Sequence, residues 1–150
     1  MPKKPLYLNS LSTSIGKLAM LEETLNNTES AQKHYEESLA IKREIPKTPY
    51  YLDNLSTTLN NLETFEEKNC AIDSAKKHFQ EALDIRKYLP QTPQYLNNLL
   101  ILLGNIAPLE VTLGDTDSAK KHLKEGLEVS RQIGNEEFIG FFEKILSNFS

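Results

Sequence analysis

The sequence predicts an all-α fold made of three helical hairpins followed by one more helix, seven helices in total. The first observation behind this prediction is an internal repeat, because the pair Tyr-Leu recurs every 44 residues, at 7–8, 51–52 and 95–96. The second is that apolar residues within each copy follow helical spacing. The third is that no segment alternates apolar and polar residues as a strand does.

Three copies of the repeat cover about residues 5–48, 49–92 and 93–135. The second half of each copy recurs in the same register as the first, without a gap. Identical in all three copies are a Ser-Ala pair, a histidine, a glutamate and a leucine: Ser30, Ala31, His34, Glu37 and Leu39, with their counterparts 44 and 88 residues later. A single hairpin cannot bury both of its apolar faces, so we expect the copies to stack on one another.

The first helix of each copy shows most clearly in the second copy, over about residues 49–67. Its apolar face is formed by Leu52, Leu55, Leu59 and Leu62. Their spacing of three, four and three residues is that of one helix face. Thr48-Pro49 and Thr92-Pro93 predict a side-chain N-cap followed by proline in the first turn. Pro108 lies within the corresponding helix of the third copy and predicts a kink there.

The second helix of each copy follows a short polar break, residues 68–70 in the second copy. Ala75, Phe79 and Leu83 continue at helical spacing, with Asp73 or Ser74 as the expected N-cap. Pro90 marks the end of the helix, because proline lacks an N–H donor and clashes with the preceding turn.

The C-terminal segment predicts half of a fourth copy. With a shift of 43 residues, Phe138 aligns with Tyr95 and Phe142 aligns with Leu99. We therefore expect a capping helix over about residues 136–149 that has no partner helix after it. Repeat arrays need such a terminal element to shield their last hairpin.

The third copy resembles a tetratricopeptide repeat. Gly114, Ala119, Leu123 and Gly126 match, in order and spacing, the family's turn glycine, small residue, large apolar residue and second small residue. The longer unit is similar to the extended repeats of kinesin light chains and of many prokaryotic regulators. The resemblance implies a right-handed α-α superhelix, or solenoid, that forms one domain over residues 1–150 and holds another protein rather than catalysing a reaction.

Composition narrows the classes of partner. The net charge is −4, so the chain lacks the excess of Lys and Arg that nucleic-acid binding or a polybasic membrane patch requires. No stretch approaches the length of an apolar membrane span, and no apolar signal core follows the N-terminus. A single cysteine, Cys70, excludes an intramolecular disulfide. These features favour a soluble, cytoplasmic protein with no nucleic-acid or membrane partner.

Catalytic and metal sites are not expected. Histidines His34, His78 and His122 recur once per copy, and equivalent residues on packed helices lie at least about 8–10 Å apart, too far to share a zinc ion. No phosphate-binding loop, nucleophile elbow or zinc signature is present. We predict that the chain is not an enzyme and uses no cofactor or metal.

The resemblance places the first helices of the copies along a concave groove that holds a peptide or helix. The polar face beside the leucine stripe suggests these partner-binding residues: Lys17, Asn54, Thr58, Asn61, Asn98, Leu102 and Asn105. An asparagine amide both donates and accepts, so a row of them suits the backbone of an extended peptide. The alternative is that these asparagines are ordinary surface residues.

A second candidate surface is apolar. Four of the six phenylalanines lie in the last 13 residues. Phe138, Phe141, Ile145 and Phe149 predict an oligomer surface, through which the chain forms a homodimer as a structural module. The alternative is that the third hairpin and the last helix bury these side chains against each other. A further alternative for the whole chain is a regulatory or sensor portion of a longer protein.

Overall fold

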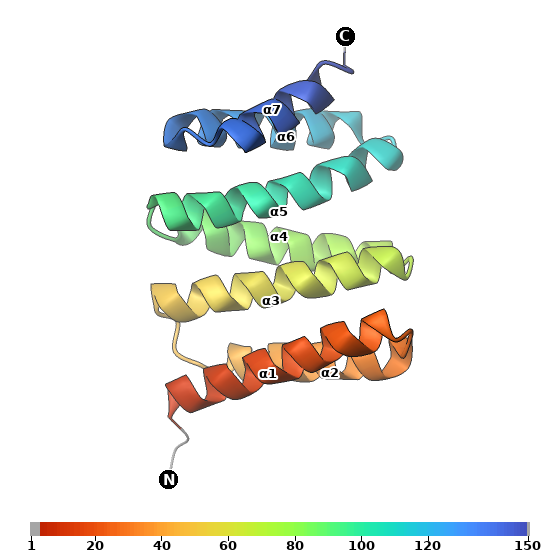
Figure 1. Ribbon diagram of the computed structural model, residues 1–150, viewed down its shortest axis with the longest axis vertical. Coiled ribbons are helices and arrows are strands. Elements are labelled where there is room, and N and C mark those ends of the chain that lie inside the picture. Colours follow the sequence, from red (N-terminus) through yellow and green to blue (C-terminus); the bar gives the residue numbers. More distant parts are fainter. Residues whose placement is uncertain (1–3, 150) are drawn as a thin grey trace. The chain divides into compact units, whose positions relative to one another are not determined.

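The computed structural model describes residues 4–149, which form seven α-helices and no strand, so the all-α prediction is confirmed (Figure 1). The helices are α1 (Pro5–Thr24), α2 (Thr28–Arg43), α3 (Pro49–Lys68), α4 (Ile72–Tyr88), α5 (Pro93–Thr112), α6 (Thr116–Ile133) and α7 (Glu136–Leu146). The chain divides into two compact units, Met1–Ile85 and Arg86–Ser150. The single domain predicted over residues 1–150 stays a prediction, and its residues 1–3 and 150 lie outside those described.

Helices α3 and α5 begin as the sequence predicts. The Thr48 side chain accepts a hydrogen bond from the backbone N–H of Tyr51 at 3.5 Å, and Thr92 does the same for Tyr95 at 3.4 Å. Proline follows each threonine at the start of the helix, where its missing N–H costs no intrahelical hydrogen bond. Helix α5 continues through Pro108 to Thr112.

Helix α4 begins at Ile72, so the prediction of Asp73 or Ser74 as its N-cap is wrong. The backbone of the preceding turn already closes the first hydrogen bond, from the N–H of Ala75 to the carbonyl of Ala71. Asp73 instead lies in the first turn, where a carboxylate is stabilised by the helix dipole.

The turns inside the three hairpins share one backbone conformation. Asn26, Cys70 and Gly114 have φ of 63°, 61° and 78°, in the left-handed region. In each turn the next residue donates its N–H to a carbonyl near the end of the preceding helix, at 2.8, 2.8 and 2.9 Å. Glycine adopts this backbone conformation without strain, whereas a residue that has a Cβ atom is strained in it. The turn glycine of the third copy therefore marks a conformation that all three copies adopt.

Replacing Cys70 with glycine is expected to raise the free energy of unfolding by about 0.5–1 kcal/mol, because it removes a side chain from a left-handed position. The measurement is urea unfolding followed by circular dichroism. Asn26→Gly is the matched control, with a smaller gain, because asparagine tolerates this conformation better than other residues do. Equal losses of stability in both variants would contradict the strain argument.

In the first unit, α1 and α2 approach closely through serines. The Ser12 hydroxyl donates to the Ser38 carbonyl and the Ser38 hydroxyl to the Ser12 carbonyl, both at 2.8 Å. The α3 leucines Leu52, Leu55, Leu59 and Leu62 are buried, and the ring of Phe65 packs 5.1 Å from that of Tyr35 on α2. The hairpin α1–α2 thus covers the apolar face of α3.

In the second unit, α7 packs on α6. Phe142 is completely buried, and a Cβ added to Gly126 on α6 would lie 2.4–2.7 Å from its ring. Helix α7 ends at Leu146 rather than near residue 149, so the predicted capping helix is too long. The Ser147 hydroxyl donates to the Lys144 carbonyl where the helix ends. Phe149 lies beyond it, with the Lys120 ammonium 5.6 Å from its ring centre.

Candidate functional site

A pocket of about 210 Å³ opens between α1 and α3 in the first unit, with α2 beneath it; we call it the α1/α3 pocket. Its lining residues are Thr13, Gly16, Lys17, Met20, Tyr35, Ser38, Lys42, Asn54, Thr57, Thr58 and Asn61. Four of the predicted partner-binding residues are among them: Lys17, Asn54, Thr58 and Asn61. These residues line one surface because α1 and α3 are equivalent helices of neighbouring repeats and both present this face to the pocket.

These four side chains differ in what they offer a ligand. Asn54 donates to the Tyr50 carbonyl at 2.8 Å, and Thr58 donates to the Asn54 carbonyl at 3.1 Å, so both are partly engaged by their own helix. Lys17 is exposed and Asn61 half-buried, and neither forms a hydrogen bond or ion pair with the described part of the chain. Lys17 and Asn61 are therefore the groups most available to a partner.

Lys42 is a pocket residue that the sequence reasoning missed. It is 5% exposed, and its ammonium donates to Asn9 Oδ1 at 3.0 Å and to Thr13 Oγ1 at 3.2 Å. Its burial lowers the pKa of the amine. The corresponding residues of the other copies are Arg86 and Ser130, so a search for identical repeat positions does not detect it.

The counterpart of this pocket in the second unit is filled. Gly104 on α5 corresponds to Gly16 on α1, and atoms of Phe141 and Phe138 lie 3.5 and 3.6 Å from the place of its missing Cβ. The aromatic rings of α7 thus occupy the space that is open in the first unit.

The predicted residues on α5 lie in different surroundings. Asn98 is half-buried and Asn105 is exposed, and their role in binding stays a prediction. Leu102 is only 1% exposed, so its assignment to a binding surface needs correction. It lies between Leu100 and Leu103, which are also buried, and an apolar side chain is more stable in this packed interior than on a surface.

The phenylalanine-rich segment is largely packed within its own unit. Phe138, Ile145 and Phe149 are half-buried, while Phe141 is 36% exposed. The rings of Phe138, Phe141 and Phe142 contact one another, with centroids 5.2–6.3 Å apart. For Phe138 and Phe142, this packing agrees with the alternative that these side chains are buried against each other and against the third hairpin. The predicted homodimer surface on α7 stays a prediction.

Each hairpin contains a glutamate–histidine pair that the sequence reasoning also missed. Nδ1 of the histidine lies 2.7 Å from the carboxylate in the pair Glu22–His34 and 2.7 Å in Glu110–His122, and Glu66 pairs with His78 in the same way. The signal was present, because the glutamates also recur every 44 residues. Each pair links the two helices of one hairpin.

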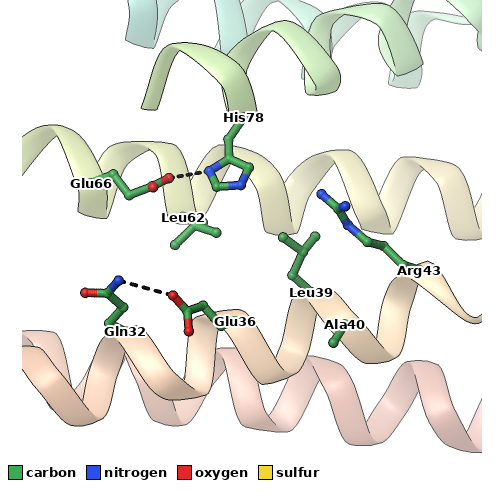
Figure 2. A pocket seen from close by; sticks show the side chains of 8 residues that line it. All are labelled: Gln32, Glu36, Leu39, Ala40, Arg43, Leu62, Glu66 and His78. Carbon is green, nitrogen blue, oxygen red and sulfur yellow. Dashed lines mark hydrogen bonds and ion pairs between the residues drawn. The ribbon is translucent and has the colours of Figure 1, made fainter. Parts of the chain in front are cut away.

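The pair Glu66–His78 lies at a second cavity of about 320 Å³ between α2, α3 and α4 (Figure 2). Leu39 and Leu62 point toward one another across it, and Arg43 lies at its edge. A histidine held by a carboxylate is a possible general base, but the lining contains no serine, cysteine or threonine to act as nucleophile. Because the pair recurs in every hairpin, we interpret it as structural.

The described residues contain no group of three or more His, Cys, Asp or Glu side chains placed to hold a metal ion. No helix in residues 4–149 is both long enough and apolar enough to cross a membrane.

Comparison with known families agrees with the helical-hairpin fold. Residues 13–45 match a family model described as tetratricopeptide repeat. The matched segment runs from within α1 to just beyond α2, so it covers most of the first hairpin. The match and the all-helical fold together support a tetratricopeptide repeat protein. Repeats of this family generally mediate protein–protein interactions, and the family is typically a non-enzymatic scaffold. No curated protein sequence matches the chain.

Proposed function

We propose that the chain is a protein-interaction module that holds an extended segment of a partner protein in the α1/α3 pocket. The observation that carries this proposal is the convergence of Lys17, Asn54, Asn61 and the buried Lys42 on one open pocket. The Asn61 amide offers both a donor and an acceptor, which matches the N–H and C=O groups of a peptide backbone.

The charges of the pocket favour an acceptor-rich or acidic segment. Its lining includes two amines, Lys17 and Lys42, and no carboxylate. The Lys42 ammonium is buried beside neutral acceptors, so a carboxylate from a partner would supply the opposite charge that it lacks. Charge-assisted hydrogen bonds of this kind are about twice as strong as neutral ones.

The proposal is tested by selecting linear peptides that bind the whole chain from a random displayed library, and by measuring their affinity for variants. Lys17→Ala/Asn61→Ala is expected to weaken binding about 10- to 100-fold, because each lost hydrogen bond contributes about 0.5–1.5 kcal/mol. Neither side chain has a partner in the described chain, so the fold is expected to stay intact.

The matched control is Lys76→Ala/Gln80→Ala, which removes the same kinds of groups from the exposed face of α4. It is expected to leave affinity unchanged. Equal binding by the wild type and both double variants would contradict the pocket assignment, and so would a selection that enriches no peptide. Selected peptides are also expected to contain more Asp and Glu than the starting library.

A further inference from the structure

The cavity between α2, α3 and α4 combines apolar walls with charged groups, and we call it the α2/α4 cavity (Figure 2). It has a volume of about 320 Å³ and shares no lining residue with the α1/α3 pocket. The lining residues that determine its chemistry are Gln32, Glu36, Leu39, Arg43, Leu62 and Glu66. The α2/α4 cavity is therefore a second, separate opening in the first unit.

Two carboxylates of the α2/α4 cavity each have only one oxygen engaged. Oε1 of Glu36 accepts a hydrogen bond from the Gln32 amide at 3.1 Å, and Oε1 of Glu66 pairs with Nδ1 of His78. Within the described part of the chain, the second oxygen of each carboxylate has no hydrogen-bond partner. The Glu66 side chain is only 10% exposed, so its free oxygen has little access to water. A donor that reaches such an oxygen offsets the cost of its burial.

The cation that suits these two oxygens does not come from the lining of the cavity. Among the described residues that line it, Arg43 is the only Lys or Arg, and its guanidinium donates to Glu81 at 2.7 Å. In Figure 2, Glu36 and Glu66 lie on one side of Leu39, whereas Arg43 lies on the other. The α2/α4 cavity thus has an acidic end that the charge of Arg43 does not neutralise.

The apolar walls of the cavity select among cations. Leu39 and Leu62, which are 7% and 2% exposed, point toward one another across it (Figure 2). An arginine side chain has a methylene stem that packs against apolar groups. Its planar guanidinium presents N–H donors in a fixed fork, which suits two carboxylate oxygens, whereas lysine offers a compact point charge. The α2/α4 cavity therefore matches arginine better than it matches an inorganic cation, which has no stem to pack against the leucines.

We propose that the α2/α4 cavity binds an arginine side chain of a partner protein, whose guanidinium donates to the free oxygens of Glu36 and Glu66. The stem of this arginine lies between Leu39 and Leu62. The inference does not rest on the proposed function of the α1/α3 pocket, whose two amines favour an acidic segment. A basic segment and an acidic segment are therefore expected at different places on the same unit.

Two-dimensional NMR of the backbone amides tests the proposal, with the full chain titrated with the peptide acetyl-Ala-Arg-Ala-amide up to roughly 20 mM, a range in which weak single-side-chain contacts are measured. Saturable shifts are expected at Glu36, Leu39, Leu62 and Glu66. The same peptide with citrulline in place of arginine has a similar shape and no charge, and it is expected to bind at least about 10-fold more weakly. Equal binding of the two peptides overturns the proposal. So do shifts that do not saturate, or that lie outside α2, α3 and α4.

A variant taken from the chain's own repeat tests the acidic end of the cavity. Gln32→Lys/Glu36→Gln gives α2 the residues that α4 carries 44 positions later, Lys76 and Gln80, so the fold is expected to stay intact. This variant is expected to bind the arginine peptide at least about 10-fold more weakly than the wild type. Glu37→Gln is the matched control, because it removes an exposed carboxylate of α2 outside the cavity lining, and its binding is expected to be unchanged. Unchanged binding by the double variant overturns the proposal, and so do equal losses in both variants, which would reflect net charge alone.

Discussion

Replacing Phe142 with alanine is expected to lower the free energy of unfolding of the second unit by about 3–5 kcal/mol, the usual cost of removing a buried phenylalanine. The ring is completely buried and rests on the backbone of α6 at Gly126. Its loss leaves a void that neighbouring side chains fill only in part. The measurement is urea unfolding together with hydrogen exchange of the α7 amides, which are expected to lose their protection.

Two further variants make this prediction specific to the contact with Gly126. Phe141→Ala is the matched control, with a smaller cost of about 1–2 kcal/mol, because that ring is 36% exposed and only partly packed. Gly126→Ala alone is expected to destabilise by about 1–3 kcal/mol, since its Cβ would overlap the Phe142 ring. The double variant Gly126→Ala/Phe142→Ala is expected to cost less than the sum of the two. Strict additivity would show that the contact is not the cause.

Replacing Glu63 with glutamine is expected to stabilise the chain in alkaline solution and to have little effect in acid. Glu63 is fully buried on α3, and its Oε1 has no hydrogen-bond partner. Burial raises the pKa of the Glu63 carboxyl to about 7, and the negative charges of Glu67 and Glu66 add to this increase. The hydrogen bond from the Thr64 hydroxyl acts in the opposite direction and lowers the pKa. The corresponding residues of the other copies are alanines, Ala19 and Ala107.

The direction of the pH dependence follows from which state binds the proton. Between the ordinary value of 4.5 and about 7, the folded chain holds a proton on Glu63 that the unfolded chain has released. Stability therefore falls as pH rises through this window and levels off above it. At 1.36 kcal/mol per pKa unit, the full loss is roughly 3 kcal/mol.

Urea unfolding of the wild type and of Glu63→Gln at pH 5 and pH 8 measures this effect. The advantage of glutamine is expected to be below about 1 kcal/mol at pH 5 and to approach roughly 3 kcal/mol at pH 8. Glu36→Gln is the control, because that carboxylate is exposed and its substitution is expected to give no such pH-dependent difference. A constant difference between wild type and Glu63→Gln at both pH values would refute the assignment.

The helices could be predicted from the sequence because their signals are local. The Thr48 and Thr92 caps, the prolines that follow them and the leucine spacing all act within a few residues. The start of α4 was misjudged because the turn backbone, rather than a side chain, closes its first hydrogen bond. The start of a helix was thus predictable where a side chain caps it, as at α3 and α5, and not where the turn backbone does so, as at α4.

The candidate site was only partly predictable, because it depends on packing between helices. Repeat spacing placed Lys17, Asn54 and Asn61 on related faces, and the structure brings them to one pocket. Lys42 could not be found in this way, since it reaches the pocket from α2 and differs in each copy. Leu102 was misassigned because helix periodicity alone does not show which flank of the leucine stripe becomes buried.

The left-handed turn at Cys70 also has a practical consequence for spectroscopy. Cys70 is the single thiol of the chain, and it is exposed between α3 and α4. A maleimide dye or nitroxide label therefore attaches at one known turn without any prior mutagenesis. The same turn lies in the unit that contains the α1/α3 pocket, so a reporter placed there can follow peptide capture without any change to the sequence.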